Sequence, residues 1–412
     1  MFDLKGFCGL FLLIFLTGCV DQSRDLASPY AIEEAVDSDF DRGTLMANLT
    51  DNIFIPNYKS TADRAVDFAE DSGVLAHYCG DSDNASKLDS AQVAWRELMD
   101  NVQQTEMHVI GPAQRNDSDL QKRIHFYTGG SLAACGLDQA VIQFDKNSDF
   151  TLTSRALNQR GMGAIEYLLF NNDLNHSCSS QVLTTVNWND LPQSDRKTQR
   201  CNLALALAKD VAEVSQSIHT QWTAADAPYR TEFLNEASRG DNFQQITDAL
   251  FYIETYTKSS KLAIPLGLDP DCKQITCVNL VESPYSQTSL RNVKVNAEEF
   301  LRIFNGGDGM GFDDLITDAG YSYITDRFKT QSAKVISQIP TIDTSLREQV
   351  LAISTTQDET ACTNAMSNPE DSSELDACSL TGLLKRITDD LKIEFVAIVN
   401  VPVPGRVQSD ND

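Results

Sequence analysis

Basic residues are scarce in this sequence, and it contains no long apolar run. The chain has 33 Lys and Arg against 59 Asp and Glu, which gives a formal net charge of −26. Such a chain repels nucleic acid and acidic headgroups, so nucleic acid is not expected as a partner. A membrane-spanning helix needs about 20 apolar residues, and the apolar run at residues 11–16 is far shorter. A transmembrane protein is therefore not predicted.

Histidine is also rare, and the motifs of several hydrolase classes are missing. The five histidines are scattered, and no HExxH motif supplies paired zinc ligands on one helix. The sequence has no GxSxG nucleophile elbow and no CxxC that would suggest a metal-thiolate cluster. For His125, which precedes Phe126 and Tyr127, a packing role is favoured over a role in a pocket. No catalytic residue is predicted.

The N-terminus has the pattern of an export signal. Lys5 supplies a positive charge, residues 11–16 form a short apolar core, and Leu16-Thr17-Gly18-Cys19 resembles the lipobox of bacterial lipoproteins. We expect cleavage after residue 18, acylation of Cys19, and a polar tether over residues 19–44. The alternative is an ordinary signal peptide with a chance cysteine. Val20, in place of an Asp at that position, favours attachment to the outer membrane on its periplasmic side.

The remaining cysteines agree with an oxidising compartment. Removal of Cys8 and Cys19 leaves eight, an even number, and we expect all eight to form disulfides. The sequence does not determine how they pair. Closeness along the chain favours the pairs Cys178–Cys201, Cys272–Cys277 and Cys362–Cys378, which leaves Cys79–Cys135 by elimination.

Apolar residues recur at steps of three and four along most of the chain, which predicts helices. The clearest faces are Leu88, Ala91, Trp95, Leu98, Val102; Leu203, Leu207, Val211, Val214, Ile218, Trp222; Leu290, Val293, Ala297, Phe300, Phe304; and Leu380, Leu384, Ile387, Leu391, Phe395. One short strand is predicted within residues 393–403. We predict an all-α fold of two antiparallel helical bundles, at residues 45–225 and 226–400, with a tail at 401–412 and a pocket between the domains.

Residues 160–170 depart from the amphipathic pattern. The segment Arg160-Gly161-Met162-Gly163-Ala164-Ile165-Glu166-Tyr167-Leu168-Leu169-Phe170 is apolar on nearly every side, as in a fully buried helix. Two glycines there suggest the close approach of a backbone or a ligand, or the start of the helix. Glu166 would need a cation, an arginine or lysine, or a raised pKa to be buried in such a segment. An ordinary ion pair with an arginine and a role in ligand binding are equally supported.

Four stretches together resemble the imelysin family of exported bacterial proteins. They are the helix containing Glu166; Trp95-Arg96 with Gly111-Pro112; Lys261-Leu262-Ala263-Ile264-Pro265-Leu266-Gly267-Leu268; and residues 282–291 followed by Phe304-Asn305-Gly306 and Gly311-Phe312-Asp313-Asp314-Leu315. The resemblance implies two helical domains with a pocket between them. Family members are classed as candidate metallopeptidases, and many act in iron uptake. The better-known branch of the family carries Gly-x-His-x-x-Glu, and this chain has Gly163 at the histidine and Glu166 at the glutamate. It therefore resembles more closely a branch of lipoproteins that lacks the histidine.

Because the motif histidine is missing, ligand binding is favoured over peptidase activity. We expect an interdomain pocket that binds iron, another metal ion or a metal-bearing small ligand, with envelope iron-transport components as partners. The expected metal ligand is Glu166, and the expected lining is Arg160, Gly161, Gly163, Glu166, Glu254, Lys261, Glu282, Ser286 and Arg291. A metallopeptidase of the imelysin type and a non-catalytic envelope scaffold are the alternatives.

Overall fold

The all-α prediction is confirmed. The computed structural model describes residues 40–127, 132–147, 149–370, 376–405 and 407, and every regular element in these ranges is a helix. No helix in these ranges is long and apolar enough to cross a membrane. The predicted signal peptide, Cys19 and most of the tether lie outside the described residues, so those predictions stay untested.

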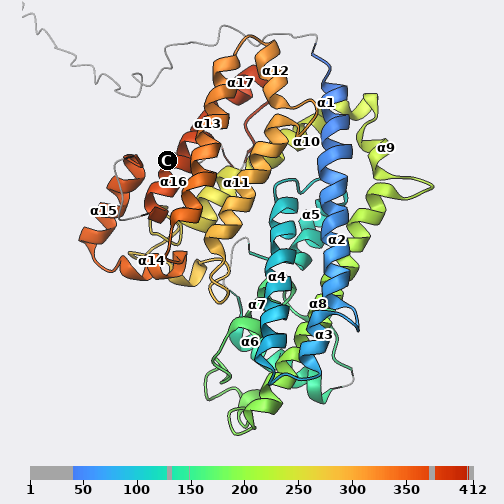
Figure 1. Cartoon of the computed structure of the whole chain (residues 1–412), viewed down its shortest axis with the longest axis vertical. Helices are drawn as coiled ribbons and strands as arrows, with labels where there is room; N and C mark the ends of the chain where they lie inside the picture. The colour runs from blue at the N-terminus through green and yellow to red at the C-terminus, as the bar shows by residue number, and fades with distance from the viewer. Residues whose placement is uncertain (1–39, 128–131, 148, 371–375, 406, 408–412) are drawn as a thin grey trace, which may run out of the picture.

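The first half of the chain, residues 40–225, is built around long helices that lie side by side (Figure 1). Helix α2 packs against α8 and α4, and α7 lies against the same two helices. Its elements are α1 (Arg42–Leu49), η2 (Thr50–Phe54), α2 (Ile55–Ala69), α3 (Val74–Cys79), α4 (Ala85–Glu106), η3 (Gly111–Ala113), α5 (Arg115–Ile124), α6 (Ala134–Lys146), η4 (Leu152–Ser154), η5 (Leu157–Gln159), α7 (Gly161–Phe170), η6 (Leu183–Thr185) and α8 (Gln193–Thr223).

Helices α1 and α2 form one continuous rod, although Pro56 follows their junction. A proline lacks the backbone N–H and clashes with the carbonyl four residues earlier, so a regular helix would break or kink there. The structure instead places a π-helical turn, η2, directly before α2. The wider turn accommodates the proline ring, and the rod continues past it.

The second half, residues 226–407, packs beside the upper part of the first (Figure 1). Helix α11 contacts α4, α13 and η8, and α16 contacts α13, α15 and η8. Its elements are α9 (Tyr229–Phe233), η7 (Glu236–Ser238), α10 (Arg239–Leu250), η8 (Ile253–Ala263), η9 (Val278–Leu280), α11 (Ser289–Asn305), α12 (Phe312–Asp318), α13 (Ser322–Gln338), η10 (Ile339–Thr341), α14 (Leu346–Ala352), α15 (Thr356–Ser367), α16 (Asp376–Asp390), η11 (Leu391–Phe395) and α17 (Val396–Val399).

The predicted apolar faces form the core. All six predicted face residues of α8, from Leu203 to Trp222, are buried, as are the five of α11. On α4 the face from Ala91 to Val102 is buried, and Leu88 packs against its edge. Apolar periodicity therefore identified which side of each long helix faces inward.

The predicted strand at residues 393–403 is wrong. Residues 391–399 continue from α16 as η11 and α17, and Asn400 ends the helix in a left-handed conformation. Phe395, Ile398 and Val399 point into the core at helical spacing. The β-branched residues favour a strand only weakly, and burial of this face outweighs that preference.

The disulfide prediction is half right. Cys272–Cys277 and Cys362–Cys378 are confirmed, with Cα–Cα distances of 5.8 and 5.3 Å. The other four cysteines pair as Cys79–Cys201 and Cys135–Cys178. Helix α3, which ends at Cys79, packs against α8, so Cys201 lies closer to Cys79 than its sequence position suggests.

The two halves make contact near the start of α1 and near the end of α8. Arg42 of α1 donates a hydrogen bond to the carbonyl of Val399 at 2.9 Å and covers the ring of Phe243. In a second contact, Tyr229 and Phe233 of α9 pack on Trp222 of α8. The division into domains at residue 225 stays a prediction, because helices on either side of it share one hydrophobic core.

Candidate ligand and metal site

Glu166 lies at the meeting point of the two halves. Its side chain is buried, and Oε1 accepts hydrogen bonds from the backbone N–H groups of Tyr285 and Ser286 at 2.9 and 2.7 Å. The hydroxyl of Ser286 donates to the same oxygen at 2.8 Å. No described residue donates a hydrogen bond to Oε2. One carboxylate oxygen therefore holds the loop of the second half, and the other is available to a ligand.

Burial dominates the electrostatics of this carboxyl group. Desolvation raises the pKa of Glu166 from 4.5 to about 7, against the hydrogen bonds from Ser286 and Tyr285 and the charge of His125, which lower it. No arginine pairs with Glu166 in the part of the chain that the structure describes, so the simple ion pair considered from the sequence is not observed. Glu166 can thus gain or lose a proton near neutral pH.

The two glycines at the start of α7 have different roles. Gly161 has a φ of +67°, and a Cβ there would lie 2.4 Å from the carbonyl oxygen of Ile124. Only glycine fits this position without movement of the backbone. A Cβ at Gly163 would meet no atom within 4 Å. The position where the resemblance places a histidine is therefore open space.

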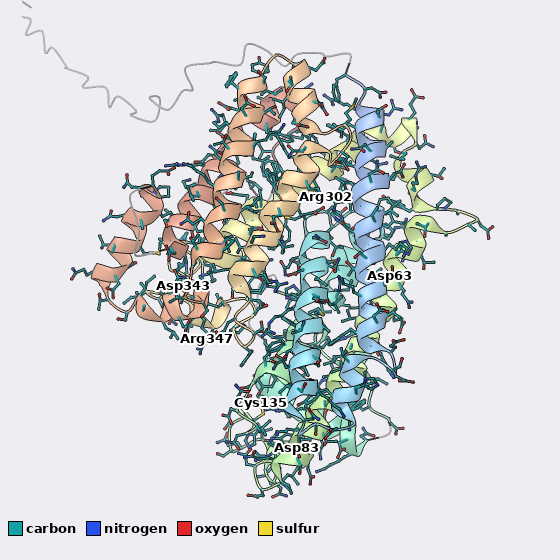
Figure 2. All side chains as sticks on the ribbon, in the orientation of Figure 1. Asp63, Asp83, Cys135, Arg302, Asp343 and Arg347 are labelled. Carbon is teal, nitrogen blue, oxygen red and sulfur yellow. A yellow bond between two sulfur atoms is a disulfide. The ribbon has the colours of Figure 1, made fainter. Side chains whose placement is uncertain are left out.

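Gly163 and Glu166 both border a cavity of about 650 Å³, here called the Glu166 cavity. It lies between α7 and the loop that precedes α11, and Arg347 of α14 also lines it. Figure 2 shows Arg347 on the side of the second half that faces the Cys135 segment. The lining includes His125, Phe126, Tyr127, Asn158, Arg160, Gly163, Glu166, Asn171, Asp173, Leu280, Glu282, Ser283, Tyr285 and Arg347. This volume is sufficient for a small molecule.

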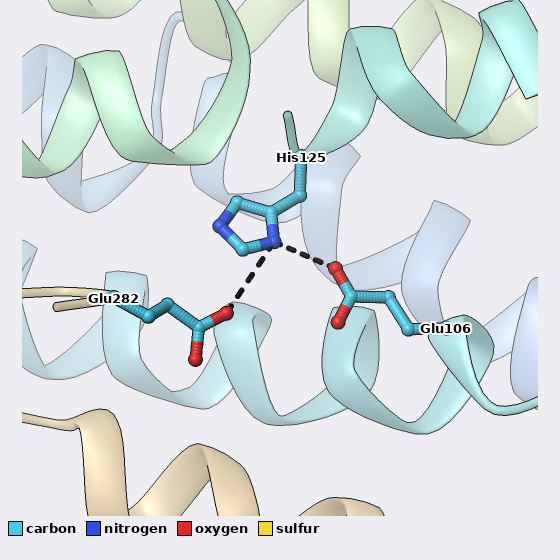
Figure 3. Close-up of side chains that lie close together, drawn as sticks. All are labelled: Glu106, His125 and Glu282. Carbon is cyan, nitrogen blue, oxygen red and sulfur yellow. Dashed lines mark hydrogen bonds and ion pairs between the residues drawn. The ribbon is translucent and has the colours of Figure 1, made fainter. Parts of the chain in front are cut away.

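A buried group of charged residues adjoins this cavity, and Figure 3 shows three of them, Glu106, His125 and Glu282. This charged cluster consists of Glu106, His125, Lys261 and Glu282. Nδ1 of His125 lies 2.6 Å from Oε1 of Glu106 and 3.9 Å from Oε1 of Glu282. Nζ of Lys261 lies 3.1 Å from Glu106 and 3.2 Å from Glu282. One ligand atom each from Glu106, His125 and Glu282 lie within 4.8 Å of one another, so they could hold a metal ion.

The opposite charges within the cluster offset the effect of burial on the pKa values of its members. Burial alone would raise the pKa of Glu106, but Lys261 and His125 outweigh it and hold that pKa well below its usual value. Burial likewise disfavours the charged form of His125, but Glu106 raises the pKa of the imidazole overall. With both glutamates ionised and His125 protonated, the four formal charges cancel. A metal among these residues would have to displace the proton of His125 and share the carboxylates with Lys261.

His125 is also oriented for a role outside the cluster. Glu106 fixes the ring through Nδ1 (Figure 3). Nε2 has no hydrogen-bond partner among the described residues. A carboxylate that holds one ring nitrogen in this way commonly leaves the other free to bind a metal. His125 and Glu166 both line the Glu166 cavity.

The remaining residues expected at the site divide into two groups. Arg160 and Glu282 line the Glu166 cavity, Ser286 binds Glu166, and Lys261 lies in the charged cluster. Arg160 also pairs with Asp210 at 2.8 Å. The structure does not place the other two there, nor Gly161, which packs against the backbone of Ile124 and does not line the cavity. Glu254 lies in a separate buried network with Lys258 and Lys392, at 3.1 and 2.9 Å, and Arg291 pairs with Asp100 at the surface.

Glu106 and Arg347 were not identified from the sequence, and His125 was assigned to packing. A signal for Glu106 was present, because it continues the buried face of α4 at i+4 from Val102 and i+8 from Leu98. No local pattern marks Arg347. Its place at the cavity depends on how α14 packs against η9, which also lines the cavity.

Comparisons with known proteins agree with this fold. One similar solved structure is an imelysin-like protein from Psychrobacter arcticum 273-4, with 15% identity and a TM-score of 0.63, covering 90% of this chain and 100% of that one. Another, described as a candidate iron-regulated protein A precursor, is from Parabacteroides distasonis ATCC 8503, with 17% identity and a TM-score of 0.57, covering 84% and 94%. No curated protein matches the chain. The family model for imelysin matches residues 54–373, most of the sequence, and this protein therefore belongs to the imelysin family.

Proposed function

We propose that this protein binds a metal ion or a metal-bearing small ligand in the Glu166 cavity and serves iron uptake. It would do so in the periplasm, held by lipid on Cys19, and pass its ligand to envelope iron-transport components. The N-terminal sequence pattern supports the anchor. The likeness to a protein described as iron-regulated supports the choice of iron, and so does the family to which the chain belongs.

The main support for the proposal is that only one oxygen of the Glu166 carboxylate has hydrogen-bond partners among the described residues. Three donors converge on Oε1, while Oε2 has no partner among the described residues and the side chain borders a cavity. Carboxylate oxygen and imidazole nitrogen both suit iron. We propose that Nε2 of His125 supplies the nitrogen that the family motif places at residue 163.

The alternative metal position is the centre of the charged cluster. Its donor set, one imidazole and two carboxylates, is chemically suitable. However, Lys261 already pairs with both carboxylates, and Gln103 and Asn292 donate further hydrogen bonds to Glu282. A cation would therefore be bound less favourably in the cluster than beside Glu166. We place the ligand in the Glu166 cavity and propose that the cluster orients His125.

Calorimetry with ferrous iron under anaerobic conditions, and with ferric citrate, tests the proposal. We expect saturable binding that Glu166→Gln abolishes, because the amide can still accept the hydrogen bonds from Ser286 but carries no charge. Glu299→Gln is the matched control, since Glu299 is equally buried but belongs to a network with Asn57 and Arg302. Equal binding by wild type and Glu166→Gln would reject the site.

A second variant separates this position from the charged cluster. Gly163→His would restore the family's helix histidine in a position where a Cβ has free space, and we expect it to tighten iron binding. A metal held between Glu106 and Glu282 would not respond to that change. Hydrolysis of an unfolded protein substrate that chelators abolish would instead favour the metallopeptidase alternative.

A further inference from the structure

The Glu166 cavity is much larger than a metal ion. Its volume is about 650 Å³, whereas one water molecule occupies about 30 Å³ in the liquid. Cavities of several hundred cubic ångströms are typical of sites for small organic molecules. An ion bound beside Glu166 would leave most of this space to solvent. The cavity therefore has room for a molecule that accompanies the metal.

The protein offers few free donor atoms to a metal in this cavity. Oε2 of Glu166 has no hydrogen-bond partner among the described residues and stays accessible within the cavity. Both oxygens of Glu282 already accept hydrogen bonds. The hydroxyl of Tyr127 donates to two backbone carbonyls, and burial raises its pKa well above the usual value. Iron sites with two or three protein ligands keep other coordination positions open. With Glu166 and His125 as ligands, those positions must be filled by groups from outside the protein.

The cavity wall also has donors that suit an anion. Arg347 is an exposed residue of α14 that lines the cavity and makes no hydrogen bond or ion pair with another described residue. The side-chain amide of Asn158, also at the wall, is likewise unpaired in the described part of the chain. A guanidinium binds a carboxylate through two parallel hydrogen bonds, and an amide N–H donates to the same kind of group. These side chains can bind the free carboxylates of a chelator.

Positive charge at the wall is not fully balanced by protein carboxylates. Arg160 and Arg123 share the carboxylate of Asp210, at 2.8 and 2.6 Å, so this part of the wall has one guanidinium in excess. Asp173 lines the cavity as well and offsets Arg347 in formal charge. The excess at Arg160 remains in the ligand-free protein.

A ferric ion would add more positive charge than the wall can neutralise. When a metal displaces the proton of His125, the charged cluster gains one negative charge, which offsets the excess guanidinium. Glu166 is then the one carboxylate left for the metal among the described lining residues. A single carboxylate does not neutralise a ferric ion, and uncompensated charge away from water is costly. A chelator that brings its own carboxylates removes this cost.

We propose that the Glu166 cavity binds a ferric complex of a small hydroxycarboxylate, the chemical class to which citrate belongs. The iron lies beside Oε2 of Glu166 and Nε2 of His125, and the free carboxylates of the chelator bind Arg347 and Asn158. This inference rests on the proposed function and deepens it by naming the form in which the iron is bound. Hydroxycarboxylates fit because they leave coordination positions of the iron open to protein ligands.

Calorimetry of the purified full-length protein tests the inference. The probes are ferric citrate, ferrous iron under anaerobic conditions, citrate alone, and the uncharged ferric complex of acetohydroxamate. We expect ferric citrate to bind at least about tenfold more tightly than the other probes. Arg347→Gln should weaken ferric citrate binding about tenfold and leave ferrous iron binding unchanged. The control Arg386→Gln removes an exposed arginine of the same half that pairs with Glu370 at 2.6 Å, and it should bind ferric citrate as the wild type does.

The outcomes separate this inference from the proposed function. Ferric citrate that binds no more tightly than ferrous iron would overturn the inference and leave a metal at Glu166 intact. Equal binding of ferric citrate by wild type and Arg347→Gln would do the same. Failure of both ferrous iron and ferric citrate to bind would overturn the proposed function, and this inference with it.

The composition of the bound ligand provides a second readout. After gel filtration of protein loaded with ferric citrate, iron and citrate should both remain with the protein in comparable amounts. Iron retained without citrate would show that the protein removes the metal from its chelator, and would overturn the inference. Arg347→Gln should melt as the wild type does, because the guanidinium has no partner to lose among the described residues. A lower melting temperature would show that Arg347 is paired within the protein, which would also overturn the inference.

Discussion

Ser286 donates two hydrogen bonds, from its backbone N–H and its hydroxyl, to a single carboxylate oxygen of Glu166 that lies 120 residues away in the sequence. This contact connects α7 of the first half to the loop that leads into α11 of the second. It also leaves the other oxygen of Glu166 without a partner among the described residues. One residue therefore joins the halves and offers a donor atom to the Glu166 cavity.

Glu166 should make stability depend on pH. Because its pKa is raised from 4.5 to about 7, the folded state keeps a proton that the unfolded chain releases in this range. Its contribution thus favours folding at acid pH and is lost as pH rises through about 7. We expect Glu166→Gln to gain stability relative to wild type between about pH 5 and pH 8, by up to about 3 kcal/mol. Urea unfolding at both pH values measures this.

The control for that experiment is Glu213→Gln, a change at an exposed acid on α8. It should track the wild type at both pH values. A stability difference between Glu166→Gln and wild type that does not change with pH would show that Glu166 keeps one protonation state throughout.

Iron binding should weaken as pH falls below about 7. The metal competes with protons for both Glu166 and His125. Burial raises the pKa of Glu166 to about 7. Burial alone would lower the pKa of His125, but the neighbouring Glu106 raises it overall. Calorimetric titrations at about pH 8, 7 and 6 should show a steady loss of affinity. Constant affinity over this range would mean that neither group is a ligand.

Removal of one member of the charged cluster should destabilise the fold strongly. Glu106→Gln leaves the buried Lys261 and His125 with less compensating charge, and a broken buried pair costs roughly 3–5 kcal/mol. Glu97→Gln, in an exposed pair with Arg64 at 2.9 Å, should cost less than about 1 kcal/mol. Denaturant unfolding of both variants makes the comparison, and similar losses would show that the cluster is solvated.

The two glycines of α7 should respond in opposite ways to the same substitution. Gly161→Ala introduces a side chain at positive φ, with its Cβ against the carbonyl of Ile124, and should cost about 2 kcal/mol or more. Gly163→Ala adds a methyl group in free space within a helix and should gain up to about 1 kcal/mol. Thermal unfolding distinguishes them, and equal effects would contradict the observed backbone.

The disulfides should differ in the stability they provide. Cys79–Cys201 spans 122 residues, and Cys272–Cys277 spans 5. In the loop-entropy model the longer closure stabilises by roughly 3 kcal/mol more. Replacing each pair by alanines and measuring urea unfolding tests this difference. Peptide mapping of the unreduced protein checks the pairing itself, and a Cys178–Cys201 peptide would contradict the structure.

Much of the fold could be predicted from the sequence because helix formation and its buried face are local properties. The apolar steps on α8 and α11 correspond directly to buried residues, and the glycines and apolar surroundings of α7 singled out Glu166. At residues 393–403 the same reasoning failed. There an alternating apolar pattern suggested a strand, but packing in the core favoured a helix.

The sequence by itself determined the helical class, the inward faces, the choice of Glu166 as a candidate ligand and the resemblance to the imelysin family. Only the tertiary structure decided that Cys79 meets Cys201 and that Glu282 meets Glu106 and His125. The physical reason is that these contacts join segments far apart in the chain. Their proximity depends on how whole helices pack, and no local residue pattern contains that information.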